Sequence, residues 1–198
     1  MLSLEDWGTV FLLASIAGAL VFGSPALALV LPSQAGEKFS ELYILGPNSM
    51  AEDLPFNVKA GENYSVYLGI GNHMGSSAYY TLYVKLRNQT EPLPNSTDGT
   101  PSPLSALYEY RILLRDGEVW EAPFNFSLSD FFFSGNSCSI YYFSINGETL
   151  DISKTALWDS GNKGYFFELF FELWIYDPQS KVFSFHNRFT EIWLNMTT

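Results

Sequence analysis

The chain contains two histidines and one cysteine, the residue types that most often serve as base, metal ligand or nucleophile. His73 lies in the glycine-rich stretch Gly69–Gly75, but a predicted strand follows it and not a helix, so the stretch is not a nucleotide-binding loop. His186 follows Phe185 in another predicted strand and has no partner at metal-ligand spacing. Both histidines are therefore expected to have structural roles.

The other reactive groups also lack a catalytic setting. Cys138 lies in the apolar run SCSIYYF, which predicts a buried thiol, and a single cysteine allows no intrachain disulfide. Asp159–Asn162 is rich in oxygen ligands but lacks the acidic spacing and closing Glu of a calcium loop. No nucleophile elbow frames any serine. We therefore assign no catalytic residue, metal or cofactor and predict that the chain is not an enzyme. A surface hydrolase would require a cleft that joins either histidine to an acid and a hydroxyl.

Two groups of residues indicate modification and contact. Glycosylation sequons, N-x-S/T, occur near predicted turns and strand ends, where a glycan can be solvated. They predict N-linked glycans and an outward-facing domain, and they occur at Asn63, Asn88, Asn95, Asn125 and Asn195. The triplet Phe131, Phe132 and Phe133 precedes the turn Ser134–Asn136. If exposed, these rings would form a partner contact, and the alternative is that they belong to the core.

The longest apolar stretch is Gly8–Leu31, and no charged residue occurs between Asp6 and Glu37. As a helix it would reach roughly 36 Å, enough to cross a hydrocarbon core of about 30 Å. The sequence thus predicts a short polar N-terminus at 1–7, a transmembrane helix at 8–32 and a linker at 33–38. Pro25 is expected to kink or end the regular helix. A removable signal peptide is the alternative, although the N-terminal region lacks Lys and Arg.

Residues 39–198 show short strand patterns separated by turns. Tyr79–Arg87 alternates, so that Thr81, Lys85 and Arg87 are predicted to face water, and Asn88–Pro103 is predicted to be a glycosylated surface loop. Asn146-Gly147 is the strongest hairpin signal, and Asp116-Gly117 is another.

Other segments allow more than one reading. Pro123 splits two predicted strands, and Lys154–Asn162 is predicted to include a helical turn. Tyr165–Tyr176 is apolar enough for a helix, with Glu168 and Glu172 four residues apart, but its aromatic content favours a long strand. About nine or ten strands and no further helix predict an all-β, immunoglobulin-like antiparallel β-sandwich.

The composition limits the partners. The chain has 198 residues, of which 47% are hydrophobic and 17% aromatic, so most of it is expected to fold. With 10 basic against 21 acidic residues, the net charge is −11. That balance argues against nucleic acid as a partner and against docking on anionic lipid through a basic patch.

Several separated blocks resemble one known family. They are Phe39–Pro47, Asp53–Asn57, Gly61-Glu62, Gly69–His73, Phe171–Trp174 and Glu191–Thr197. Together they resemble an archaeal membrane-protein family that is catalogued as domain of unknown function sixteen-sixteen. The resemblance implies apolar membrane segments followed by an outward-facing sandwich related to adhesion modules, and it brings no catalytic residues. Family members often have several membrane segments, whereas this chain has one.

The sequence therefore predicts a single-pass protein of an archaeal cell membrane with an extracellular C-terminal domain. Its expected partners are other surface or membrane proteins, copies of itself, N-linked glycans and the lipid bilayer. The alternative is a pilin-like filament subunit whose N-terminal helix packs in the filament core. Small residues in this helix would permit such packing, and they include Gly18, Gly23 and the alanines 14, 17, 19, 26 and 28.

Overall fold

The computed structural model describes residues 4–30 and 37–197, and in the helix it describes the side chains of 7–20. The chain divides into two compact units, Met1–Lys38 and Phe39–Thr198. Residues 1–3 of the predicted N-terminus and 31–36, which hold the predicted end of the helix and most of the linker, lie outside the described residues.

The first unit contains one helix, α1 (Leu4–Val30). It begins four residues earlier than predicted and continues through Pro25. Its 27 residues correspond to about 40 Å of helix. No helix in the described part of the chain has both the length and the hydropathy of a membrane-crossing segment.

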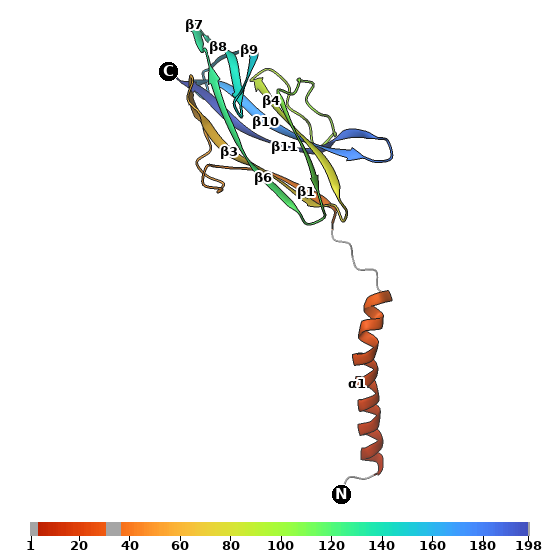
Figure 1. Cartoon of the computed structure of the whole chain (residues 1–198). Coiled ribbons are helices and arrows are strands. Elements are labelled where there is room, and N and C mark those ends of the chain that lie inside the picture. Colours follow the sequence, from red (N-terminus) through yellow and green to blue (C-terminus); the bar gives the residue numbers. More distant parts are fainter. Residues whose placement is uncertain (1–3, 31–36, 198) are drawn as a thin grey trace. The chain divides into compact units, whose positions relative to one another are not determined.

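The second unit is built of strands, which confirms the prediction of a mostly β fold (Figure 1). Its strands are β1 (Phe39–Leu45), β2 (Asn57–Lys59), β3 (Tyr64–His73), β4 (Ala78–Asn88), β5 (Tyr108–Leu114), β6 (Val119–Ser129), β7 (Phe132–Ser134), β8 (Ser137–Ile145), β9 (Glu148–Asp159), β10 (Gly164–Asp177) and β11 (Val182–Thr197).

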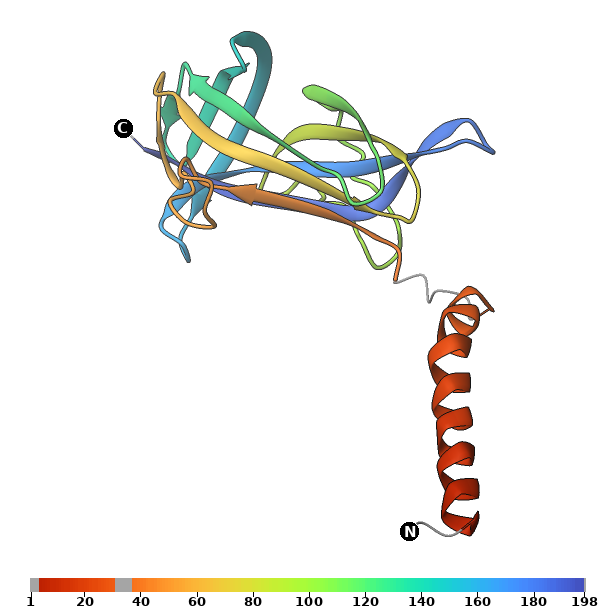
Figure 2. The ribbon, with the colours of Figure 1, turned by 60° about the horizontal axis from the view of Figure 1, so that its bottom comes forward.

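These strands form one curled sheet in the order β1-β3-β6-β8-β9-β10-β11-β2, in which β4 also pairs with β10 and β5, and β7 with β8. All pairings are antiparallel except that of β2 with the end of β11. The halves β1-β3-β6-β8-β9 and β5-β4-β10-β11-β2 are joined by two residue pairs between β9 and β10. Figure 2 shows how the sheet curls.

The core lies between the two halves. Val66, Leu68 and Ile70 of β3 are fully buried, as are Leu82 and Val84 of β4. The rings of Phe124 on β6 and Phe171 on β10 meet edge to face, with centroids 5.2 Å apart. Burial of this aliphatic and aromatic surface stabilises the closed sheet.

The local turn signals are confirmed. Asn146 and Gly147 both have positive φ, +50° and +90°, as a two-residue hairpin between β8 and β9 requires. Gly117, with φ +77°, turns the chain between β5 and β6. The strand interpretation of Tyr165–Tyr176 is confirmed too, because β10 pairs with β4 on one side and β11 on the other.

Several predicted element boundaries are wrong. His73 ends β3 and is not in a loop. The expected helical turn at Lys154–Asn162 is instead the continuation of β9 to Asp159. Pro123 does not split β6. It lies opposite Tyr67 of β3, and on its other side it has no strand partner in β8, because β8 pairs only with residues 126–129 of β6.

The prediction that the polar face of β4 is wet is also wrong. Thr81 is 0% exposed and Lys85 only 4% exposed. The segment 89–107 packs over this face, where the Lys85 ammonium donates a hydrogen bond to the Ser102 carbonyl at 2.9 Å. Much of the predicted surface loop is therefore tied to the sheet.

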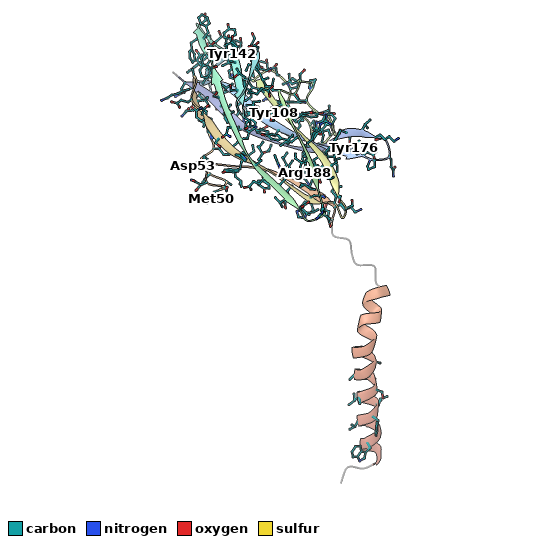
Figure 3. All side chains as sticks on the ribbon, viewed as in Figure 1. Met50, Asp53, Tyr108, Tyr142, Tyr176 and Arg188 are labelled. Atoms are coloured by element: carbon teal, nitrogen blue, oxygen red, sulfur yellow. The ribbon has the colours of Figure 1, made fainter. Side chains whose placement is uncertain are left out.

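The β10–β11 hairpin extends beyond its neighbours. The pairing of β10 with β4 ends at Ile175. Beyond it, Tyr176 pairs with Phe183 and Asp177 with Val182, so this part of β10 has β11 as its strand partner but not β4. The hairpin therefore projects from the sheet (Figures 1 and 2), and Tyr176 and Tyr142 lie toward opposite ends of the domain (Figure 3).

Candidate functional site

Exposed aromatic side chains gather beside β7. Phe132 is 59% exposed and lines an open hollow of about 470 Å³ together with Asp130, Phe131 and Tyr141. Phe131 and Phe133 are half-buried and pack against the core. The aromatic rings form a chain of contacts, with centroid distances of 6.4 Å from Phe131 to Phe133, 5.4 Å from Phe133 to Tyr165 and 5.1 Å from Tyr165 to Trp158. We call this surface the β7 aromatic patch: Phe131, Phe132, Phe133, Tyr141, Trp158 and Tyr165.

A β-bulge enlarges the patch. Between the pairs Ile140–Lys154 and Tyr142–Asp151, β8 has one residue, Tyr141, and β9 has two, so the extra residue lies on β9, where Ser153 has a positive φ of +41°. As a result Tyr141 and Tyr142 both face outward, at 43% and 38% exposed. A regular strand would have pointed one of them inward. The sequence signal was the pair of consecutive tyrosines between the buried Ile140 and Phe143.

A hydroxyl network joins His186 to Ser40, a residue that the sequence did not single out. The Ser40 hydroxyl lies 2.9 Å from His186 Nε2 and 2.7 Å from the Tyr80 hydroxyl. The Tyr80 hydroxyl in turn donates to Asn72 Oδ1 at 3.1 Å. Ser40, Tyr80 and Asn72 are essentially buried.

The direction of these bonds decides what Ser40 can do. Tyr80 has one hydroxyl proton, and it is used on Asn72, so Ser40 must donate to Tyr80 and accept from His186 Nε2–H. A serine nucleophile needs the opposite arrangement, in which the histidine nitrogen accepts its proton. Burial, then the charge of Arg188, lower the pKa of His186, so the ring is neutral at pH 7.

His73 belongs to a separate contact. Its ring stacks on Phe39 at 4.6 Å, and its Nε2 lies 3.4 Å from Glu41 Oε1. Because Ser40 and Glu41 are consecutive strand residues, their side chains point to opposite faces of the sheet. The two histidines, the acid and the hydroxyl are therefore not brought into one catalytic arrangement.

Two buried ion pairs lie under segment 89–107. Glu172, 0% exposed, accepts from the Lys85 ammonium at 2.8 Å and from the Ser102 backbone N–H at 2.7 Å. The Trp174 indole N–H donates to it as well, at 3.2 Å. These bonds tie β4, β10 and the covering segment together.

Arg87 and Glu168 form the second buried ion pair, and the carboxyl group of Glu191 lies beside Glu168. Burial, then a hydrogen bond with Glu191, raise the pKa of Glu168 to about 7, while Arg87 acts in the opposite direction. Two facing carboxyl groups can bond only if one carries a proton. With that proton, Arg87, Glu168 and Glu191 together have no net charge.

The remaining sequence candidates are Cys138 and the stretch Asp159–Asn162. Burial raises the pKa of Cys138 to about 11, so the thiol stays protonated, and the prediction that it is buried is confirmed. Hydrogen bonds from the Asn162 side chain, then from backbone N–H groups of Asn162 and Gly161, lower the pKa of Asp159 and close the β9–β10 turn. Within residues 4–30 and 37–197, no three metal-binding side chains cluster.

The five sequon asparagines differ in their surroundings. Asn63 and Asn125 are exposed and line the same hollow of about 140 Å³. Asn95 is exposed, but its Nδ2 donates to Asp98 at 2.6 Å. Asn88 and Asn195 are half-buried, and their Nδ2 groups donate to the Thr155 carbonyl and to Asn57 Oδ1.

If glycans are added to the folded domain, occupancy is expected to be highest at Asn63 and Asn125 and lowest at Asn195. A transferase must reach the amide nitrogen, and Asn195 uses that nitrogen in a bond of 3.0 Å to Asn57. Intact-protein mass spectrometry should show that Asn125→Gln removes one glycan mass, whereas Asn195→Gln removes none. Equal losses in the two variants would contradict the expectation.

Comparisons with known proteins complete the description of these surfaces. A family model described as "Domain of unknown function (DUF1616)" matches residues 32–143. No curated protein matches.

The similar solved structures are distant. A mutant β-glucosidase from Listeria innocua in complex with laminaribiose has a TM-score of 0.41 at 11% identity, over 81% of this chain and 16% of that one. The same enzyme in complex with glucose has a TM-score of 0.38 with the same identity and coverage, so this chain spans about a sixth of its length. One chain of the complex between zinc 2-glycoprotein and prolactin inducible protein, from human seminal plasma, has a TM-score of 0.37 at 9% identity, over 83% of this chain and 100% of that one. Similarity at this level assigns no activity.

Proposed function

Because this chain belongs to the family described as domain of unknown function DUF1616, and that description gives no activity, we propose a function from its own residues. The protein is a non-enzymatic, membrane-anchored archaeal cell-surface protein. Helix α1 holds it in the membrane, and its glycosylated, immunoglobulin-like β-sandwich lies outside the cell. There the domain binds or assembles with other surface or membrane proteins, including copies of itself.

One observation carries the anchoring: among residues 7–20 of α1, the part whose side chains the structure describes, the large apolar side chains are largely uncovered. Each is at least half exposed: Trp7, Val10, Phe11, Leu12, Leu13, Ile16 and Leu20. A helix that is apolar on all sides must be buried in lipid or among other helices. Exposure to water would cost about 25 cal/mol for each Å² of apolar surface.

The strand-built unit supports the rest of the proposal. Its two halves, antiparallel except for β2, enclose a common core, as the two sheets of an immunoglobulin-like sandwich do. The β7 aromatic patch leaves apolar rings in contact with water, which is typical of a protein contact surface. The Ser40 hydroxyl accepts a hydrogen bond from His186 and does not donate one to it. This supports a non-enzymatic role for the only buried serine–histidine contact described in this structure.

A filament subunit is the second candidate. Apart from the nearby backbone of their own helix, Gly8 and Gly18 have no atoms within 4 Å of where a side chain would begin, which leaves room for close approach of another helix. In this case identical helices, and not lipid, cover α1.

The anchor is tested by expressing the full chain in an archaeal host. We expect it to stay with membranes after alkaline carbonate extraction and its C-terminal domain to be digested by protease added to intact cells. Release by carbonate as single chains would overturn the anchor, and release as long polymers would favour the filament. Protection from the protease would overturn the outward orientation.

The contact surface is tested by photocrosslinking on the same cells. With p-benzoylphenylalanine at Phe132, we expect a discrete adduct with another surface protein or with a second copy. The control position is Glu148, which is exposed in the β8–β9 hairpin. Equal labelling at both positions, or none at Phe132, would overturn the role of the patch. Phe132→Ser should change the free energy of unfolding by less than about 0.5 kcal/mol, because this ring is mostly exposed.

A further inference from the structure

A second aromatic hollow lies on the other face of β10. Tyr165 belongs to the β7 aromatic patch, and Phe166, the next residue, points to the opposite face. There Phe166 lines a hollow of about 310 Å³ with Phe56, Asn162 and Trp193. This volume is within the range of small-molecule binding sites, which begins near 300 Å³.

The walls of the hollow are aromatic rings. Phe166 lies at the base of the hollow and is only 4% exposed. The ring centroids of Phe56 and Trp193 lie 6.0 and 6.2 Å from the centroid of the Phe166 ring. Phe56 is 50% exposed and Trp193 is 40% exposed. Two ring surfaces are therefore open to a ligand, and a third supports them.

Neutral amides accompany these rings. Asn162 lines the hollow, and Asn195 and Asn57 lie beside it because they pair in register with Phe166 across β10, β11 and β2. The space for Asn195 exists because residue 164 is glycine, since a Cβ there would collide with Asn195 Oδ1 and with the Phe166 ring. The four lining residues carry no charge.

The buried ion pair on the same face holds one wall in place. The Arg87 guanidinium lies 5.7 Å from the centre of the Trp193 ring, and Arg87 is itself bonded to Glu168. This contact fixes the indole before any ligand arrives, which lowers the entropy cost of binding.

We propose that this hollow binds a neutral saccharide, with a pyranose ring stacked between Phe56 and Trp193 and its hydroxyls bonded to the amide of Asn162. The C–H face of a pyranose is apolar and fits a flat ring, and its hydroxyls both donate and accept, as amides do. An anion or cation would find no opposite charge among the lining residues, and a lipid chain could not use the donor and acceptor that the Asn162 amide keeps beside its bond to Asp159. This site is independent of the anchor and of the β7 aromatic patch.

The test uses the full chain in a sugar-free zwitterionic detergent. The probes are cellotriose, maltotriose, mannotriose and triacetylchitotriose, measured by saturation-transfer NMR and calorimetry. We expect at least one to bind and Trp193→Ala to weaken it at least about tenfold. Phe56→Leu, which keeps the apolar volume but removes the flat ring, should weaken it as well.

The matched control is Trp158→Ala, because Trp158 is equally exposed, at 40%, but belongs to the β7 aromatic patch. It should leave saccharide binding unchanged, and a near-wild-type melting temperature identifies the variants that are folded. Binding that survives in folded Trp193→Ala and Phe56→Leu overturns the site, as does binding lost equally in Trp158→Ala. Failure of all four probes at about millimolar concentration overturns it too. So does a glycan on Asn195, since the protein's own sugar would then fill the hollow.

Discussion

Glu172→Gln is expected to lower the free energy of unfolding by about 3–5 kcal/mol, the usual cost of breaking a buried ion pair by removing one partner. Glu172 is 0% exposed and accepts three hydrogen bonds, one of them from the Lys85 ammonium. Glutamine keeps the shape of the side chain but leaves Lys85 as a buried charge without its counterion. The total stability of a domain is about 5–15 kcal/mol, so much of it would be lost.

Urea unfolding followed by tryptophan fluorescence measures this loss. The matched control is Glu109→Gln, which breaks the ion pair of Glu109 with Arg111, whose side chains are 43% and 54% exposed. Water already solvates both groups, so the control should lose less than about 1 kcal/mol. If Glu172→Gln lost no more than the control, Lys85 and Glu172 would not form a buried pair.

The second large effect is a fall in stability between about pH 4.5 and 7, caused by Glu168. Burial raises the pKa of this carboxyl group from 4.5 to about 7 in the folded chain. Between these values the folded state holds a proton that the unfolded state releases, so the free energy of unfolding decreases as pH rises. A difference of this size corresponds to about 3 kcal/mol.

Glu168→Gln isolates this contribution, because the amide imitates the protonated acid and can still bond Glu191. Urea unfolding at pH 5 and pH 8 should show the variant near wild type at pH 5 and more stable than wild type at pH 8. Glu62→Gln serves as the control, since Glu62 is exposed. If wild type and Glu168→Gln lost stability in parallel over this range, the proton would not be held by Glu168.

Patterns that depend on neighbouring residues predicted the mostly β character of the chain and several of its strands and turns. Asn146-Gly147 specifies its hairpin through backbone conformations that glycine and asparagine adopt readily, so no distant contact was needed. The aromatic content of 165–176 was enough to identify β10, although its spacing also allowed a helix.

What depended on distant residues could not be predicted. The alternation in β4 separates Lys85 from the core correctly, but its burial comes from Ser102 and Glu172, which are 17 and 87 residues away. The Ser40 network likewise joins residues that are 40 and 146 positions apart. The saccharide hollow combines Phe56, Phe166 and Trp193 from three strand regions, and no local pattern connects them.

The placement of the domain's two ends has a mechanical consequence. His186 contacts Ser40 near the start of β1, and β11 then runs eleven residues further to Thr197, a distance of about 35 Å. A pull between Phe39 and Thr197 would therefore act along the strands and load the ladders of β1 and β11 in shear. Their hydrogen bonds would have to yield together and could not peel apart singly, so the domain is suited to bear tension along its length.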